Sequence, residues 1–349
     1  MKAALFEAYR GPLSIKTVAD PVCPTDGVVL KVEACGVCRS DWHGWSGADP
    51  DVAVPHVPGH EFAGIIIETG RDCRRFRKGD RVTAPFILAC GDCADCRGGE
   101  PTVCNHQYVV GFSGWGAFAE MLAVPRADFN LVLLPDNLGV TEAAAMGCRL
   151  TTAFRGLVDR AQLQPGEWLA IHGCGGVGLS AVMIAAALGA QILAIDVNDE
   201  ALAMARTLGA NVTLNPNAVV DVGMAIRELT GGGAHVSIDA LGITATFHNS
   251  IRGLRKLGRH VQIGQPLERH ANPTIPLLET VYSRQISIMG TRGIAASRFS
   301  ALLGMIAGGR LDPARMITRR IGLSESGDAL AAMNGYSGVG VTVIDNLAG

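Results

Sequence analysis

The chain has 349 residues, of which 48% are hydrophobic, and this supplies enough apolar side chains for about two domains. Its formal net charge of -2 lacks the basic excess typical of proteins that bind nucleic acids or membrane surfaces, so we expect neither partner. Charged residues make up only 18% of the chain, which favours a homo-oligomer because more apolar surface is left to bury.

The N-terminal segment reaches Glu7 and Arg10 before any long apolar run develops, so it does not resemble a secretory signal. The longest apolar run, 181–188, is too short to cross a bilayer. We therefore expect a cytoplasmic protein.

The first 150 residues predict a β-rich domain. Segments 28–32 and 64–68 are rich in β-branched residues and are bounded by turn residues at 24–27 and at Gly70. Prolines and glycines interrupt the segment often, and no long helical periodicity develops before about residue 140.

Four cysteines then fall within fifteen residues, in the arrangement C-x2-C-x2-C-x7-C at Cys90, Cys93, Cys96 and Cys104. Four thiolates at this spacing can close a tetrahedral structural zinc site without help from distant segments. Two local disulfides are the alternative, but they are typical of small secreted scaffolds rather than of a chain this long.

After residue 150 the pattern changes to strands that alternate with helices. We expect strands at 167–172, 192–196, 212–214, 236–239 and 260–263, and helices at 176–188 and 199–208. Such alternation predicts a parallel, doubly wound sheet with right-handed crossovers. The fold class is therefore α/β.

A dinucleotide fingerprint lies between the first of these strands and its helix. The pattern G-x-G-x-x-G is satisfied at Gly173, Gly175, Gly176, Val177 and Gly178, and Asp196 follows at the end of the next strand. The glycines allow a pyrophosphate to approach the helix N-terminus, while the carboxylate accepts hydrogen bonds from ribose hydroxyls. A carboxylate at this position repels a 2′-phosphate, so we expect NAD rather than NADP.

A second metal site is expected from scattered residues. Cys38, His60 and one distant residue could provide the three protein ligands of a catalytic zinc, with a fourth position open. Cys35 and Cys38 also form a C-x2-C pair, but we interpret Cys35 as a buried, inert cysteine because no second pair remains to complete a zinc ribbon.

These motifs together resemble the zinc-dependent alcohol dehydrogenases of the medium-chain dehydrogenase/reductase superfamily, over essentially the whole chain. The family pattern G-H-E-x-x-G-x5-G is complete at Gly59, His60, Glu61, Gly64 and Gly70, and Cys-x-Ser-x-x-His is present at Cys38, Ser40 and His43. The resemblance implies a β-rich GroES-like catalytic domain formed by residues 1–149 and 289–349. It also implies a Rossmann NAD-binding domain at 150–288.

The resemblance also implies a role for each matching residue. Cys38, His60 and Cys148 would bind the catalytic zinc, so that each subunit holds two zinc ions. Glu61 would be a neighbouring carboxylate able to ligate the metal transiently, and Asp41 would orient His60. Ser40 and His43 would relay the substrate proton, and Arg39 would contact the cofactor pyrophosphate. For Cys148 the alternative is a plain buried cysteine at the domain junction.

The implied reaction is the reversible oxidation of an alcohol to an aldehyde, with hydride transfer to NAD. Polyol dehydrogenases of the superfamily usually place a glutamate near position 148, and Trp42, Phe86 and Trp115 lie near the metal-bearing segments. We therefore expect a hydrophobic primary alcohol as the small-molecule substrate. A polyol or secondary-alcohol dehydrogenase, a zinc-free reductase and a non-catalytic binding protein on the same fold are the alternatives. The strand near 285–289 resembles the family's subunit-pairing edge, which favours a tetramer and leaves a dimer open.

Overall fold

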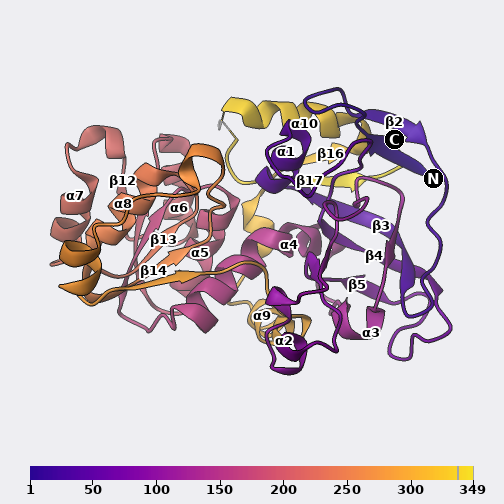
Figure 1. Ribbon diagram of the computed structural model, residues 1–349, viewed down its shortest axis with the longest axis horizontal. Coiled ribbons are helices and arrows are strands. Elements are labelled where there is room, and N and C mark those ends of the chain that lie inside the picture. The colour runs from indigo at the N-terminus through magenta and orange to yellow at the C-terminus, as the bar shows by residue number, and fades with distance from the viewer. Residues whose placement is uncertain (336–337, 349) are drawn as a thin grey trace. The chain divides into compact units, whose positions relative to one another are not determined.

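The computed structural model describes residues 1–335 and 338–348, which form two compact units (Figure 1). Unit 1 comprises Met1–Thr151 and Gly293–Gly349, and unit 2 comprises Thr152–Arg292. The expected division at 288/289 would cut the last strand of unit 2, β15 (Ser287–Gly290), which pairs with its neighbour β14 in parallel. The structure divides the chain after that strand instead.

Unit 1 is built on one large sheet in the strand order β16-β17-β3-β4-β5-β9, with β8 also paired to β3. Two small antiparallel pairs, β1–β2 and β6–β7, complete its strands. The bounds are β1 Lys2–Leu5, β2 Ser14–Thr17, β3 Val28–Val37, β4 Glu61–Thr69, β5 Arg81–Thr83, β6 Ile87–Leu88, β7 Tyr108–Val109, β8 Met121–Val124, β9 Val132–Leu133, β16 Ile317–Gly322 and β17 Val341–Asn346.

The central strands β3 and β4 carry the core of unit 1. Nearly every residue of β3 is buried, and the strand extends five residues beyond the expected end at 32. Phe6, Phe62 and Phe118 are buried in the same core. Because β3 and β4 are antiparallel, with Gly36 opposite Glu61, the residues that follow β3 and precede β4 are brought together. These residues include Cys38 and His60.

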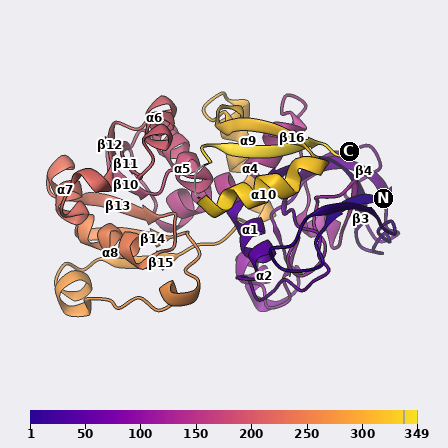
Figure 2. The ribbon, with the colours of Figure 1, turned by 90° about the horizontal axis from the view of Figure 1, so that it is seen from above.

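The helices of unit 1 are α1 (Arg39–Ser46), α2 (Ala94–Arg97), α3 (Ala127–Asn130), α4 (Val140–Phe154, which continues into unit 2), α9 (Phe299–Ala307) and α10 (Ser326–Ala332). Helix α1 starts directly after its N-cap Cys38, and Figure 2 shows it beside α10, which lies near the C-terminal end of the chain. Helix α4 is interrupted at Gly147, which has non-helical dihedral angles.

Unit 2 is the expected doubly wound domain. Its six parallel strands have the order β12-β11-β10-β13-β14-β15, which is the Rossmann order with the first strand near the centre. The strands are β10 Trp168–His172, β11 Gln191–Ile195, β12 Val212–Leu214, β13 Ala234–Asp239, β14 Leu254–Gln262 and β15 Ser287–Gly290. The helices are α5 Gly176–Ala187, α6 Asp199–Leu208, α7 Val222–Leu229 and α8 Thr244–Gly253.

The predicted fold class, α/β with a β-rich domain plus a doubly wound parallel sheet, is therefore confirmed. Among the described residues, no helix combines the length and apolar character needed to span a membrane.

Candidate metal centres and dinucleotide site

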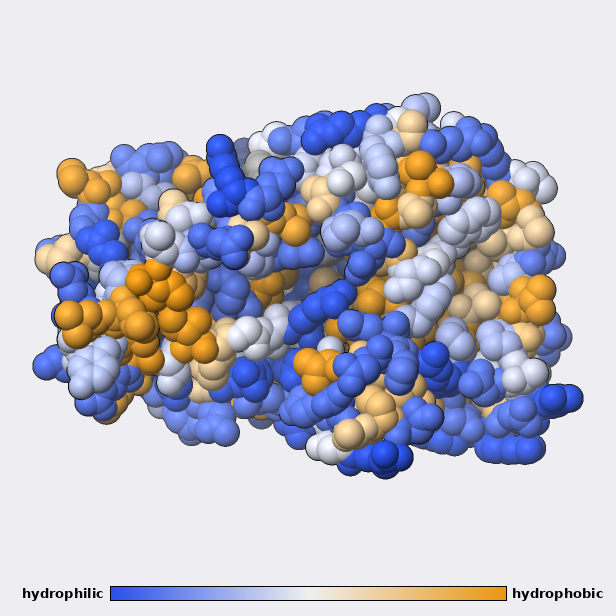
Figure 3. All heavy atoms as spheres, in the orientation of Figure 1, coloured by the Kyte–Doolittle hydropathy of each residue, from blue (hydrophilic) through white to orange (hydrophobic). Residues whose placement is uncertain are grey.

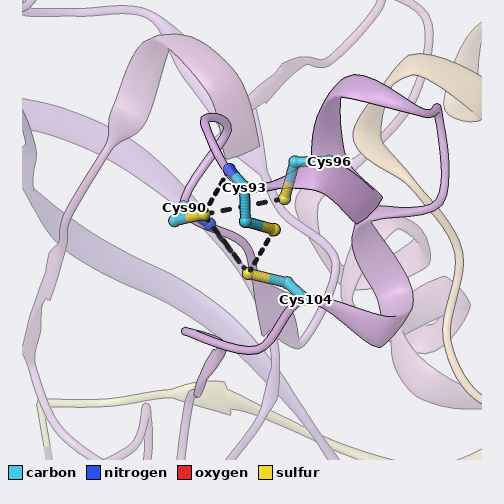
Figure 4. A group of neighbouring side chains, drawn as sticks. All are labelled: Cys90, Cys93, Cys96 and Cys104. Atoms are coloured by element: carbon cyan, nitrogen blue, oxygen red, sulfur yellow. Dashed lines mark hydrogen bonds between the residues drawn. The ribbon is translucent and has the colours of Figure 1, made fainter.

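The four clustered cysteines meet in one compact group on a lobe of unit 1 (Figure 4). Cys90 follows β6, Cys93 caps α2, Cys96 lies on α2, and Cys104 ends the short helix Pro101–Val103. The Sγ atoms of Cys90 and Cys104 are 3.5 Å apart, and the pairs Cys90–Cys96 and Cys93–Cys104 are each 3.8 Å apart. A tetrahedron with zinc–sulfur bonds of about 2.3 Å has edges of about 3.8 Å, so the group fits zinc.

Backbone N–H groups stabilise thiolates in this lobe. The N–H groups of Cys93 and Cys90 donate to Cys90 Sγ and Cys104 Sγ, both at 3.3 Å. The backbone hydrogen bond from Cys96 lowers the pKa of Cys93 to about 6, whereas burial raises the pKa of Cys96 to about 12. All the cysteines are free, so none of them forms the alternative disulfides.

A second group joins Cys38, His60, Glu61 and Cys148, whose ligand atoms all lie within 4.8 Å of one another. Cys38 lies between β3 and α1, His60 and Glu61 lie at the start of β4, and Cys148 follows the interruption of α4. The structure thus brings together three segments that are far apart in the sequence. The hydrogen bond between the two thiols lowers the pKa of Cys38 well below its usual value and raises that of Cys148.

His60 is oriented as a metal ligand. Its Nδ1 lies 2.8 Å from Asp41 Oδ1, which also accepts a 3.0 Å hydrogen bond from the Gly59 N–H. The other ring nitrogen, Nε2, is buried and has no hydrogen-bond partner among the described residues. An unpaired nitrogen beside two thiols, with a carboxylate behind the opposite nitrogen, fits the donor set of a zinc site.

Sequence reasoning placed Glu61 here but missed its main partner, Arg149. Burial raises the pKa of Glu61 to about 7, and the adjacent Arg149 guanidinium opposes this rise. Arg149 is itself buried and donates from Nη2 to Glu61 Oε2. No spacing rule connects these residues, because 88 positions separate them.

The aromatic surroundings of His60 were only partly expected. The rings of Phe86 and Phe112 meet the imidazole edge-on, with centroids 5.8 and 5.3 Å away. Phe112 was missed. The ring of Trp42, by contrast, stacks on the Arg39 guanidinium, whose Cζ lies 3.8 Å from the ring centroid. The Nε1–H group of Trp42 donates to Asn334 Oδ1. Trp115 is partly exposed and donates to Pro55 O.

Helix α1 carries the remaining candidates of unit 1. Ser40 and His43 are both half-buried and lie three residues apart, so their side chains project from one face of the helix. Arg39 donates from Nη1 to Met333 O at the end of α10. These residues begin immediately after the candidate ligand Cys38.

The glycine fingerprint adopts the expected strand–turn–helix form in unit 2. It connects β10 to α5, with Gly175 as the N-cap and Gly176, Val177 and Gly178 in the first turn. A Cβ at Gly178 would lie 1.8 Å from Gly173 O, so only glycine permits this close approach. Asp196 follows β11 and accepts hydrogen bonds from Cys174 N–H at 2.6 Å and Asn198 N–H at 2.8 Å. Its carboxylate therefore lies against the glycine loop.

Known proteins match both units. Residues 24–136 match the family of alcohol dehydrogenase GroES-like domains, and residues 176–308 match the zinc-binding dehydrogenase family. An alcohol dehydrogenase of Geobacillus stearothermophilus is 37% identical over 297 residues, which are 84% of this chain and 86% of the relative.

Two further proteins match nearly from end to end. An NAD-dependent alcohol dehydrogenase of Sulfurisphaera tokodaii is 32% identical over 99% of both chains. The solved structure of the alcohol dehydrogenase TADH from Thermus sp. ATN1 has a TM-score of 0.90 at 31% identity, and the match covers 99% of this chain and 100% of that one. The chain therefore belongs to the zinc-type alcohol dehydrogenases of the medium-chain dehydrogenase/reductase superfamily.

Proposed function

We propose that the protein oxidises a hydrophobic primary alcohol to the aldehyde, reversibly, with NAD as hydride acceptor and zinc at the Cys38–His60–Cys148 group. The observation that carries the proposal is the convergence of these ligand atoms, together with Nε2 of His60, which has no hydrogen-bond partner within residues 1–335 and 338–348. The balanced reaction converts alcohol and NAD⁺ into aldehyde, NADH and one proton.

The two metal groups would divide structural and chemical roles. Zinc at Cys38, His60 and Cys148 would supply the Lewis acidity that favours deprotonation of an alcohol. Asp41 fixes the His60 ring so that Nε2 faces the two thiols. The four-cysteine group offers four thiolates and therefore leaves no position for substrate. With one metal ion in each group, we expect two zinc ions per chain.

Residues of α1 would move the substrate proton. The Ser40 hydroxyl can accept a proton from the alcohol and pass one onward, and His43 can release it to solvent because an imidazole titrates near neutral pH. Their half-buried positions on the helix that directly follows Cys38 support this role. Arg39 would contact the cofactor pyrophosphate through its guanidinium.

NAD is supported by the carboxylate of Asp196 at the glycine loop. Its oxygens can accept hydrogen bonds from the adenosine ribose hydroxyls, and their charge disfavours the 2′-phosphate of NADP. Gly173, Gly175, Gly176, Val177 and Gly178 would provide the pyrophosphate site.

The substrate class is supported by the two phenylalanines that face His60. An apolar wall beside the metal ligands favours a hydrophobic alcohol over a diol, whose second hydroxyl would lose its hydration without a partner. The kcat/KM values for ethanol, benzyl alcohol and a short diol test this class. A preference for the diol would support the alternative of a polyol dehydrogenase.

We further propose a homo-oligomer, with a tetramer favoured over a dimer. The edge strand β15 and the segment before it expose the large apolar side chains of Ile275, Leu277, Leu278, Tyr282 and Ile288. Figure 3 shows apolar side chains gathered on part of the unit 2 surface that faces the viewer. Light scattering on the eluting protein would give the subunit number, and a monomer at micromolar concentration would contradict this assignment.

We also propose that the protein works in the cytoplasm. The free thiols support this compartment, because thiols stay reduced there.

A steady-state assay with NAD and benzyl alcohol, combined with a metal count, tests the proposal. NADH formation by protein that holds two zinc ions per chain supports it. Protein that holds a single zinc and shows no turnover would favour the non-catalytic alternative.

A further inference from the structure

The buried ion pair between Glu61 and Arg149 lies directly against the candidate ligands. Glu61 Oε1 accepts hydrogen bonds from the backbone N–H groups of Cys148 at 2.9 Å and Arg149 at 3.2 Å, and Oε2 accepts one from Arg149 Nη2. Arg149 Nη1 donates to Val37 O at 3.0 Å. Both carboxylate oxygens are therefore engaged, and the guanidinium is anchored to the last residue of β3.

Two glycines make room for this arrangement. A Cβ at Gly36 would lie 2.3 Å from Glu61 Oε2 and 2.7 Å from Arg149 Nη2. A Cβ at Gly147 would lie 2.3 Å from Glu61 Cβ. Any other residue at either position would collide with the pair. The interruption of α4 at Gly147 thus lets the backbone of Cys148 and Arg149 reach the carboxylate.

Glu61 also lies close enough to compete for the metal. One of its oxygens is within 4.8 Å of the ligand atoms of Cys38, His60 and Cys148. A fourth protein ligand would fill the position that an alcohol needs. Two thiolates balance the charge of a zinc ion, so Arg149 is the group that balances the remaining negative charge of Glu61.

We propose that Arg149 is a positioning residue that holds the Glu61 carboxylate against the backbone of α4 and off the metal. The fourth position of the Cys38–His60–Cys148 group then stays open to substrate. This inference rests on the proposed function only in that it takes this group as the metal site. Arg149 itself touches neither the substrate nor the cofactor in this account.

Cobalt(II)-loaded protein tests the inference without relying on turnover. The visible spectrum of cobalt reports its ligands, and subtraction of the spectrum of Cys38→Ala removes the contribution of the four-cysteine group. We expect Arg149→Met to change the difference spectrum, because the released carboxylate becomes a ligand. The kcat for an alcohol should fall about 10–100-fold, as is typical when a partner of a metal site is removed.

The double variant Glu61→Gln/Arg149→Met separates positioning from a merely structural role. It lacks the competing carboxylate, so its cobalt spectrum should return toward that of the wild type. Arg149→Lys keeps the positive charge and an N–H donor group, and it should restore part of the turnover. Arg155→Met is the matched control, since Arg155 is another buried arginine and belongs to unit 2. Its spectrum should be unchanged.

Three outcomes would overturn the inference. One is an Arg149→Met spectrum identical to that of the wild type. Another is a spectral change that persists in the double variant. The third decides the matter even if Arg149→Met fails to fold: loss of a ligand band in Glu61→Gln would mean that Glu61 already binds the metal. A wild type that shows these spectra but oxidises no alcohol would instead contradict the proposed function alone.

Discussion

The two cysteine-containing groups of unit 1 differ in how they are assembled. The four-cysteine group comes from fifteen consecutive residues, and all four of its ligands are thiols. The Cys38–His60–Cys148 group comes from three separate segments and combines thiols, an imidazole and a carboxylate that is held by Arg149. In our proposal the local group is complete in itself, whereas the dispersed group leaves one position open. We therefore expect the saturated group to stabilise the fold and the unsaturated group to perform the chemistry.

Substitutions at two neighbouring buried cysteines test the difference between the two groups with the largest expected effect on activity. Cys38→Ala should abolish turnover, by about 10³-fold or more, because a metal site contributes several kcal/mol to the transition state and each 1.36 kcal/mol is a factor of ten. Cys35→Ala is the matched control, since Cys35 is equally buried but belongs to neither ligand group. Initial rates and circular dichroism check both variants. Loss of activity in Cys35→Ala alone would reverse the assignment.

Cys96→Ala should act on stability instead. Removal of one thiolate from the four-cysteine group loosens its metal, and the loss of a few kcal/mol lowers the Tm by roughly 2–4 °C per kcal/mol in a domain of about 200 residues. Thermal unfolding and solubility measure the effect, with Cys73→Ala as a control outside both groups. A variant of unchanged Tm and normal activity would contradict the structural assignment.

Asp196→Gly tests the preference for NAD over NADP at the glycine loop of unit 2. Removing the carboxylate should raise the ratio of kcat/KM for NADP to that for NAD at least about tenfold, equivalent to about 1.4 kcal/mol, because the repulsion of the 2′-phosphate is lost. Steady-state kinetics with both cofactors check the ratio, and Asp199→Gly in the following helix is the control. An unchanged ratio would remove Asp196 from the cofactor site.

The buried His172 differs from His60 and gives a prediction with a smaller expected effect, on the pH dependence of the unfolding free energy. Both side chains are buried, and in the described part of the chain Nε2 of each has no hydrogen-bond partner, but His172 belongs to neither candidate ligand group. Burial lowers the pKa of His172 to about 3. Its neutral form is therefore favoured in the folded state, so its contribution is present above pH 6.5 and is lost as the pH falls toward 3.

Between pH 7.5 and 5.5 this loss amounts to about 1.4 kcal/mol, because the unfolded chain binds a proton that the folded chain does not. His172→Leu should flatten the dependence of the unfolding free energy on pH over this range. Denaturant titrations at both values measure the slope. An equal slope in the wild type and the variant would show that folding does not lower the pKa of His172.

Local patterns in the sequence predicted the parts of the molecule that depend on neighbours in the chain. The four cysteines and the glycine fingerprint are short enough for spacing to define them, and the alternation of strands and helices predicted the parallel sheet. The dispersed site depends on strand pairing, which the sequence does not display. The pairing of β3 with β4 brings Cys38 to His60, and the family resemblance, rather than any spacing, supplied Cys148. Arg149 and Phe112 carry no motif, so only their packing against Glu61 and His60 reveals them.

The central claim is that a saturated structural site and an open catalytic site coexist in one chain. The most direct test is the zinc content of wild type and Cys38→Ala, measured by mass spectrometry on the same samples that are assayed for alcohol oxidation. We predict two zinc ions per chain in the active wild type and one in the inactive, folded variant. An active wild type with a single zinc, or a Cys38→Ala variant that keeps two zinc ions and full activity, would contradict it.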